Sequence, residues 1–168
     1  MRFILHIYHG NGKGKTTAAV GLAIRAAGAG LNVMFMQFLK NGNSSENEIL
    51  KQIKNINICC CDVCNKFTFR MNDTEKKFVT EKHNDMINRA FRSYADIIIL
   101  DEFLDAYNKN MIDRKISGNM ILSDQREIIL TGRNPAEIFL EKADYISEIN
   151  AIRHPYEKGI TARKGIEY

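Results

Sequence analysis

The sequence predicts an α/β protein built on a doubly wound, mostly parallel sheet of about six strands. Short apolar runs alternate with segments in which apolar residues recur at helical spacing, a pattern typical of successive strand–helix–strand units. The run 96–100 ends in four consecutive apolar residues, as expected for a parallel strand buried on both faces. The first apolar run, 3–8, passes through a glycine-rich segment into a stretch that favours a helix. We expect one domain over residues 1–168, a length typical of single domains.

Each element follows from apolar periodicity and from the turn residues between periodic segments. The expected strands are 3–8, 32–38, 56–60, 96–100, 126–131 and 144–148. The expected helices are 17–26, 46–54, 74–93, 102–109 and 113–122. A further helix is expected with Asn134 as its cap and Pro135 as its first residue. The last twenty residues are expected to be mostly irregular.

The glycine-rich segment between the first strand and the first helix has the layout of a phosphate-binding P-loop, so the predicted fold is that of P-loop NTPases. Its glycines let backbone N–H groups converge on phosphate oxygens, and the helix N-terminus adds roughly half a positive charge. Lys15 would lie against the phosphates, and the Thr16 hydroxyl would face Mg²⁺. Because His9 stands where the usual pattern has its first glycine, an ordinary glycine-rich turn remains the alternative. The predicted nucleotide-binding residues are Gly10, Asn11, Gly12, Lys13, Gly14, Lys15, Thr16 and Thr17.

Polar residues follow two other predicted strands at the edge where the P-loop lies. Asp101 and Glu102 directly follow the expected strand 96–100, and a carboxylate there can hold Mg²⁺ on bound phosphates. The alternative for Asp101 is that it caps the following helix. Arg133 follows the strand 126–131 and could contact an anion or a carbonyl, and an exposed loop arginine is the alternative. Together with the P-loop, these residues predict a Mg²⁺–nucleotide site.

The charge balance favours a small anionic ligand over nucleic acid. The net charge is +4, from 24 basic and 20 acidic residues, and the basic residues are dispersed. No apolar run reaches the roughly 18 residues needed to cross a membrane, so we expect no membrane association. The chain begins on a core strand, so we expect no signal peptide and a cytoplasmic location.

The loop after the third strand contains two unusual groups. Cys59, Cys60, Cys61 and Cys64 lie together, but a structural zinc site normally has a second pair of ligands, so small buried side chains are the favoured interpretation. Phe67 and Phe69 follow, and loop aromatics more often belong to a small core cluster than to a ligand site.

The order of these segments resembles the P-loop type of ATP:corrinoid adenosyltransferase. The resemblance runs almost from end to end of the chain. Each matching segment is moderately specific alone, and the segments together, in this order and spacing, are highly specific. The matching segments are Gly10 to Ala19, Arg25 to Gly28, Gln37 to Lys40, Phe67 to Phe69, Leu100 to Glu102, Thr131 to Arg133 and the tail from His154 to Tyr168.

The resemblance implies an activity, a metal and a set of site residues. The 5′-deoxyadenosyl group of ATP would be transferred to the cobalt of cob(I)alamin or a precursor corrinoid, and triphosphate would leave. Thr16 and Glu102 match the family's binding positions for Mg²⁺ (or Mn²⁺). Lys15, which would bind phosphate, and Glu102 would be the catalytic residues. Phe67 and Phe69 match an aromatic pair that presses on the lower face of the corrin and displaces the lower axial ligand. The resulting four-coordinate Co(II) is easier to reduce.

The sequence departs from the family pattern at two points. The second aromatic residue of the family is usually tryptophan and is Phe69 here. Because the sequence starts at the first expected strand, we expect it to lack the N-terminal helical extension of the longer family members. The resemblance also implies a homodimer and an electron donor such as a flavodoxin.

Two other functions remain compatible with a Mg²⁺–nucleotide site. A small-molecule kinase would share the P-loop and the acidic pair, but no arginine-rich lid segment is apparent. A nucleotide-dependent regulatory switch would leave the aromatic pair and the C-terminal motif without a role.

Overall fold

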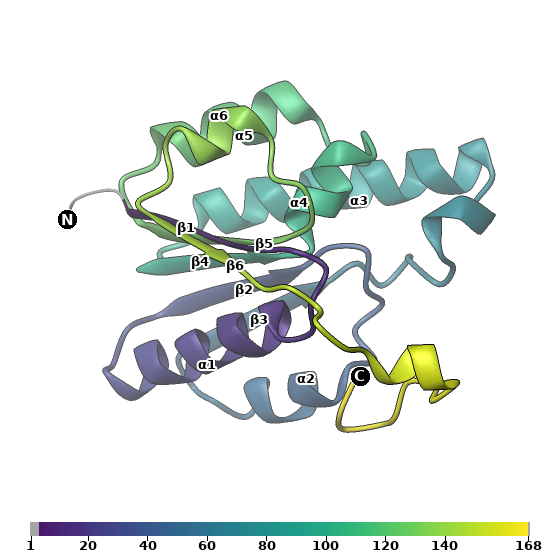
Figure 1. The fold of residues 1–168 in the computed structure, drawn as a ribbon. Helices are drawn as coiled ribbons and strands as arrows, with labels where there is room; N and C mark the ends of the chain where they lie inside the picture. The colour runs from purple at the N-terminus through teal and green to yellow at the C-terminus, as the bar shows by residue number, and fades with distance from the viewer. Residues whose placement is uncertain (1–3, 168) are drawn as a thin grey trace.

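The fold is a six-stranded, fully parallel sheet with helices on both faces, described here for residues 4–167 of a computed structural model (Figure 1). The strand order is β3-β2-β4-β5-β1-β6, and every pair of neighbours is parallel. The strands are β1 (Ile4–His9), β2 (Val33–Gln37), β3 (Ile56–Cys60), β4 (Ile97–Asp101), β5 (Glu127–Gly132) and β6 (Tyr145–Glu148). The predicted α/β class, strand number and parallel arrangement are therefore confirmed.

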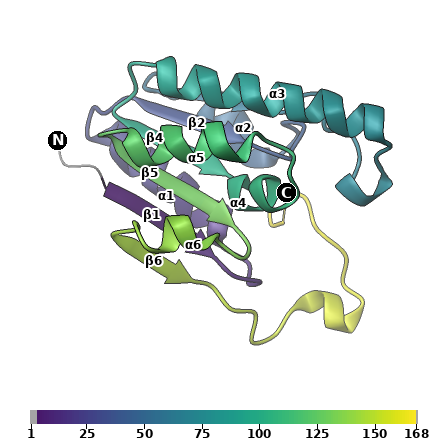
Figure 2. The ribbon, with the colours of Figure 1, turned by 90° about the horizontal axis from the view of Figure 1, so that it is seen from above.

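The helices fall into two layers. Figure 1 shows α1 (Lys15–Gly28) and α2 (Ser45–Leu50) on one face of the sheet, and the remaining helices on the other. The second layer, seen from above in Figure 2, consists of α3 (Asp73–Arg92), α4 (Phe103–Asn108), α5 (Arg114–Ser123) and α6 (Glu137–Leu140). Short 3-10 turns occur at Thr68–Arg70 and Pro155–Lys158, so the C-terminal segment is mostly irregular, as expected.

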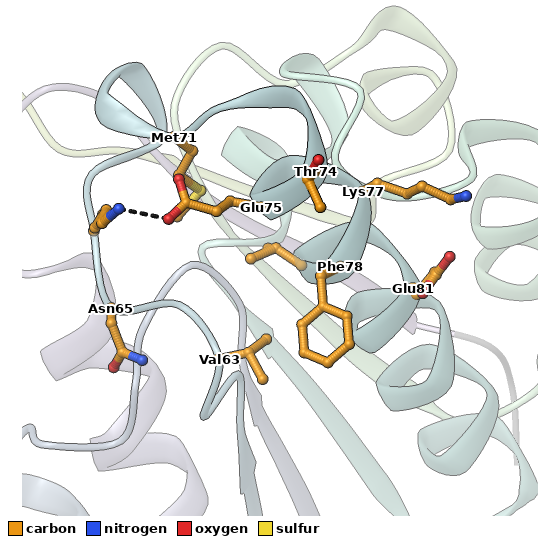
Figure 3. A pocket seen from close by; sticks show the side chains of 10 residues that line it. Val63, Asn65, Met71, Thr74, Glu75, Lys77, Phe78 and Glu81 are labelled. Atoms are coloured by element: carbon orange, nitrogen blue, oxygen red, sulfur yellow. Dashed lines mark hydrogen bonds and ion pairs between the residues drawn. The ribbon is translucent and has the colours of Figure 1, made fainter.

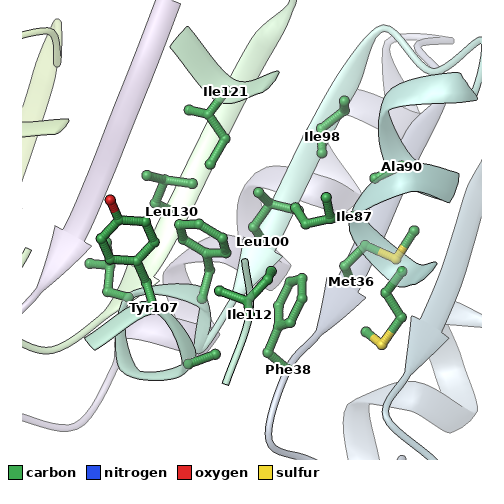
Figure 4. Packing of buried hydrophobic residues seen from close by; sticks show 14 of the residues in the cluster. Met36, Phe38, Ile87, Ala90, Ile98, Leu100, Tyr107, Ile112, Ile121 and Leu130 are labelled. Atoms are coloured by element: carbon green, nitrogen blue, oxygen red, sulfur yellow. The ribbon is translucent and has the colours of Figure 1, made fainter. Parts of the chain in front are cut away.

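The central strand β4 shows why the sheet needs both layers. Ile97 and Ile99 join the core beneath α1, whereas Ile98 and Leu100 join the core beneath α3 to α6. This alternation follows from the two-residue period of a strand. Figure 4 shows the second core, in which Ile98 and Leu100 pack with Ile87 of α3. Burial on both faces explains the continuous apolar run in the sequence.

The predicted boundaries agree with the structure to within a residue or two for most elements, except that α2 ends four residues earlier than expected. Phe3, the first residue of the first expected strand, lies outside the described residues. The expected cap at Asn134 is wrong, because α6 begins at Glu137 with Ala136 before it. Asn134 instead has a positive φ of 48°, and its carbonyl oxygen accepts a hydrogen bond of 2.7 Å from the Asn108 amide. Tertiary contact with α4 thus decides the backbone conformation where the sequence offered a standard cap.

Candidate active site

The predicted P-loop connects β1 to α1 at the carboxyl edge of the sheet. Gly10 and Gly14 have positive φ values of 114° and 125°, which residues with side chains rarely adopt. A Cβ at Gly10 or Gly12 would lie 2.4 or 2.7 Å from the carbonyl oxygen of Ile149. The Gly12 N–H donates to that same oxygen at 2.7 Å. The loop is therefore fixed tightly against the segment that follows β6. This close approach requires glycine at positions 10 and 12, whereas at Gly14 the requirement comes from the positive φ alone.

Asp101 is the centre of the polar network beside the P-loop. Its side chain is fully buried at the end of β4. Its Oδ1 accepts hydrogen bonds from the hydroxyls of Thr16 (2.9 Å) and Thr131 (2.7 Å). Its Oδ2 accepts from the ammonium of Lys40 at 2.8 Å and from the amide of Gln37 at 3.4 Å. Residues from α1, β2, β5 and the loop after β2 thus converge on one carboxylate.

The structure excludes the alternative that Asp101 caps the next helix. The residue at the cap position of α4 is Glu102, and the Glu102 side chain makes no capping hydrogen bond. Glu102 has a left-handed φ of 60°, and its N–H donates to the Thr131 hydroxyl at 2.9 Å. This turn separates the two carboxylates: Asp101 points into the network and Glu102 lines the cavity above it.

Lys40 holds a positive charge against the oxygens of this network. Its ammonium donates to the Asp101 carboxylate and, at 3.2 Å, to the Thr16 hydroxyl. Burial disfavours the charge on Lys40, but the adjacent Asp101 outweighs burial and raises the Lys40 pKa. The Thr16 and Asp101 oxygens are therefore arranged to face a cation, which is what a Mg²⁺ site at this place requires.

His83 of α3 positions the loop that carries Lys40. The Leu39 N–H donates to His83 Nε2 at 3.2 Å, while His83 Nδ1 donates to the Met111 carbonyl at 2.7 Å. Burial lowers the pKa of His83 to about 4, so the ring is neutral near pH 7 and can accept the Leu39 hydrogen bond. Leu39 has a positive φ of 56°, which turns the chain back at the end of β2. No sequence pattern pointed to this contact, because His83 lies 44 residues from Leu39 along the chain.

A large cavity of about 1200 Å³ opens above the network. It brings together Lys15, Thr16, Thr17, Glu102 and Arg133 of the predicted site. The cavity also takes in residues that the sequence had not assigned to the site, among them Lys40 and Asp105. Lys40 ends the segment Gln37 to Lys40 that matches the family, and Asp105 lies three residues after Glu102, so these two segments were the available signal.

The other predicted loop residues, Gly10 to Gly14, are not among the residues that line the cavity. Gly12 is buried, and Lys13 is exposed. The Asn11 side chain accepts a hydrogen bond of 2.9 Å from the Ala151 N–H, which ties the P-loop to the C-terminal segment.

The aromatic pair lies on the surface beside this cavity. Phe67 and Phe69 are 70% and 77% exposed, so they are not part of a small core cluster as the residues alone favoured. Their rings are stacked, with centroids 5.6 Å apart and planes 11° from parallel. Phe67 lines the cavity together with Thr68 and Arg70, and Phe69 stacks on Phe67. Exposed stacked rings at a cavity mouth are suited to contact a large flat ligand.

The C-terminal segment returns to the same cavity. Gly165, Ile166 and Glu167 form part of its wall, near α2, as the end of the yellow trace in Figure 1 indicates. An ion pair of 3.0 Å between Arg163 and Glu167 closes this turn. Tyr168, the last residue of the matching tail, lies outside the described residues.

The four cysteines are free thiols. Cys61 and Cys64 are buried, as expected, whereas Cys59 and Cys60 are only partly buried. Within residues 4–167, no group of three or more cysteine, histidine or acidic residues could hold a metal ion. Cys64 also lines the cavity.

Stability should depend on the protonation of Glu102. Burial, and secondly the charge of Asp101, raise the pKa of Glu102 from 4.5 to about 7. The pKa of Glu102 is therefore higher in the folded protein than in the unfolded chain. The resulting contribution of Glu102 to folding stability is fully present below pH 4.5 and is lost as the pH rises through 7. Glutamine does not titrate, so only the unaltered protein should lose this contribution. Measured without ligands, the difference in melting temperature between Glu102→Gln and the unaltered protein should therefore move in favour of the variant between pH 5 and 7.5. Thermal melts at several pH values measure this difference, with the exposed Glu141→Gln as control. Parallel pH profiles for Glu102→Gln and the unaltered protein would contradict the placement of this carboxyl.

No helix within residues 4–167 combines the length and apolar character needed to span a membrane.

Comparison with known proteins identifies the family. Residues 2–168 match the family described as ATP:corrinoid adenosyltransferase BtuR/CobO/CobP. The chain is 30% identical to corrinoid adenosyltransferase CobA of Salmonella typhimurium, over 99% of this chain and 86% of that protein. It is 31% identical to a corrinoid adenosyltransferase of Escherichia coli K12 with the same coverage, and 26% identical to one of Pseudomonas aeruginosa over 99% and 84% of the two chains. The chain belongs to the ATP:corrinoid adenosyltransferase family.

Proposed function

We propose that this protein transfers the 5′-deoxyadenosyl group of ATP to the cobalt of a reduced corrinoid and releases triphosphate, in the biosynthesis or salvage of adenosylcobalamin. The observation that carries the proposal is a single cavity lined both by Lys15, Thr16 and Thr17 at the end of the P-loop and by Phe67, whose exposed ring stacks on that of Phe69. The loop suits a polyphosphate, and the stacked rings suit a large planar substrate.

The P-loop and the Asp101 network would hold ATP. Backbone N–H groups of residues 10–17, the ammonium of Lys15 and the guanidinium of Arg133 supply positive charge for the triphosphate. The oxygens of Thr16 and Glu102 are hard donors that fit Mg²⁺ (or Mn²⁺), and Lys40 already places a cation against Thr16. When bound, the metal would neutralise charge on the leaving triphosphate. Asp101 orients the Thr16 hydroxyl.

The chemistry at cobalt belongs to the corrinoid substrate, and the protein positions the reactants. Cobalt attacks the ribose 5′-carbon, a cobalt–carbon bond forms, and the bond from that carbon to the triphosphate oxygen breaks. A kinase would instead break the γ-phosphoryl bond and leave ADP.

The products of one turnover test this function. We expect cob(I)alamin and ATP to yield a light-sensitive cobalt–carbon product together with triphosphate or its hydrolysis products. Phosphorus NMR of the quenched reaction measures these species, and a reaction without corrinoid is the control. ADP formed one-for-one with product, without triphosphate, would reject the assignment and favour the kinase.

The aromatic pair should matter most when the enzyme must handle Co(II). Phe67→Ala and Phe69→Ala should each slow adenosylation that starts from Co(II) by about tenfold, because less ring surface is left to displace the lower ligand. When chemically prepared Co(I) is supplied, the loss should be small. Initial rates with the two cobalt states, measured by visible absorbance, give this comparison. Equal losses in both assays would mean that the rings serve another purpose.

We further propose a homodimer that works in the cytoplasm with an electron donor such as a flavodoxin. Family membership supports the dimer and the donor. Four free thiols and the use of ATP fit a reducing compartment.

A further inference from the structure

A second pocket, which we call the side pocket, lies next to the active-site cavity. It has a volume of about 540 Å³, within the range of small-molecule sites of roughly 300–1,000 Å³. Its apolar lining comes from Val63, Met71, Phe78 and Val79. Figure 3 shows Val63 and the Phe78 ring lying across the pocket from each other. The pocket lies between the loop 61–71 and the first turns of α3.

The loop 61–71 forms a common wall between the two hollows. Asn65 and Lys66 line both of them. Lys66 forms an ion pair of 2.5 Å with Glu75 of α3, drawn as a dashed line in Figure 3. Glu75 also accepts a hydrogen bond of 3.0 Å from the Asn72 N–H as part of a capping box. The loop that carries Phe67 and Phe69 is thus tied to α3, the helix that forms the other side of the side pocket.

The side pocket exposes apolar surface that a ligand could cover. Phe78 is 59% exposed, whereas Met71 and Val79 behind it are 7% and 2% exposed. A flat exposed ring over a buried apolar floor is suited to stack on another flat ring. Polar groups surround it: Asn65 at one end, and Thr74, Lys77 and Glu81 along α3 (Figure 3). Hydroxyl, amide and ammonium groups of this kind can bind a sugar or a phosphate.

We infer that the side pocket binds the nitrogenous base, with its sugar–phosphate tether, of a complete corrinoid. The inference rests on the proposed function. If Phe67 and Phe69 occupy the lower face of the corrin, the displaced base must leave the cobalt while remaining covalently attached. The side pocket is the neighbouring hollow across the wall that carries those two rings. It offers an apolar floor and an aromatic ring for the base, and Lys66 and Lys77 for the tether phosphate.

Comparing a corrinoid that has the base with one that lacks it tests this inference. The probes are cob(II)alamin and cob(II)inamide, each titrated into the protein with ATP and Mg²⁺ and followed by visible absorbance. Phe78→Ala should weaken cob(II)alamin binding by about tenfold and change cob(II)inamide binding by less than twofold. Phe78→Tyr, which keeps the ring, should bind both probes as the unaltered protein does. Tyr94, 99% exposed just beyond α3, provides the matched control Tyr94→Ala, which should change neither.

The outcomes separate this inference from the proposed function. Equal weakening of both probes by Phe78→Ala would overturn the inference, because Phe78 would then shape the common wall. Unchanged binding of both would also overturn it. In either case the function stands if the unaltered protein adenosylates both reduced corrinoids. If the unaltered protein adenosylates neither, the proposed function fails, and the inference fails with it.

Discussion

Asp101→Asn is expected to lower the free energy of unfolding by about 2–3 kcal/mol. For a chain of this length, this is a fall in melting temperature of roughly 5–10 °C. Asparagine keeps the size of the side chain but replaces one acceptor oxygen with an NH₂ group. That group would face either the Lys40 ammonium and the Gln37 amide, or the two threonine hydroxyls. Against Lys40 and Gln37 the NH₂ group would meet other donors, and in either orientation Lys40 loses its counter-charge.

The magnitude follows from the burial of the two charges. The Asp101 side chain is fully buried, whereas the Lys40 side chain is 27% exposed. Removing one partner of a fully buried pair costs about 3–5 kcal/mol, and the partial exposure of Lys40 reduces that figure. Adenosylation should fall as well, because Asp101 orients the Thr16 hydroxyl.

Thermal melts and turnover assays measure both effects of Asp101→Asn. The matched control is Asp62→Asn, which breaks a surface ion pair of 3.0 Å with Lys82 and should cost at most about 1 kcal/mol. Equal melting temperatures for Asp101→Asn and Asp62→Asn would show that the Asp101 network does not hold the site together.

Lys15→Ala is expected to weaken ATP binding or turnover by about 10- to 100-fold. The variant removes a charge-assisted contact with phosphate worth roughly 1.5–3 kcal/mol. In the structure the Lys15 ammonium donates to the Gly12 carbonyl at 2.7 Å, within its own loop. Burial lowers the Lys15 pKa, and the negative charge of Glu102 partly offsets this effect. The ammonium is thus partly desolvated and placed beside the cavity before any phosphate binds.

The fold should survive the loss of Lys15. The hydrogen bond from Lys15 to the Gly12 carbonyl lies within the loop itself, so circular dichroism and the melting temperature should change little. ATP affinity by calorimetry and initial rates of adenosylation provide the readouts. Lys142→Ala, an exposed lysine before β6 at the opposite edge of the sheet, is the control. Unchanged ATP affinity in correctly folded Lys15→Ala would show that the triphosphate lies elsewhere.

The strands could be predicted from sequence because each one is a short apolar segment with clear boundaries. The run 96–100 is the clearest case, since burial on both faces removes any need for polar alternation. The P-loop could also be recognised, because a strand, glycines, Lys15 and Thr16 follow one another within a few residues. The cap of α6 was predicted wrongly, because a contact between Asn108 and the carbonyl of Asn134 overrides the local preference.

The role of Asp101 could not be read from spacing. Its partners Thr16, Lys40 and Thr131 lie 85, 61 and 30 residues away along the chain. The sequence left capping open as an alternative to metal support, and only the assembled sheet edge distinguishes the two. His83 is a similar case, since its hydrogen bond to Leu39 spans 44 residues.

The sequence by itself determined the fold class and the family, because these depend on local patterns and on the order of motifs along the chain. The tertiary structure decided which groups meet and which are exposed. It showed that Phe67 and Phe69 stack on the surface beside the cavity and that a side pocket lies behind the loop that carries them. Exposure and contact depend on how distant segments pack, and the free energy of that packing is spread over the whole core. A linear pattern of residues therefore cannot specify them.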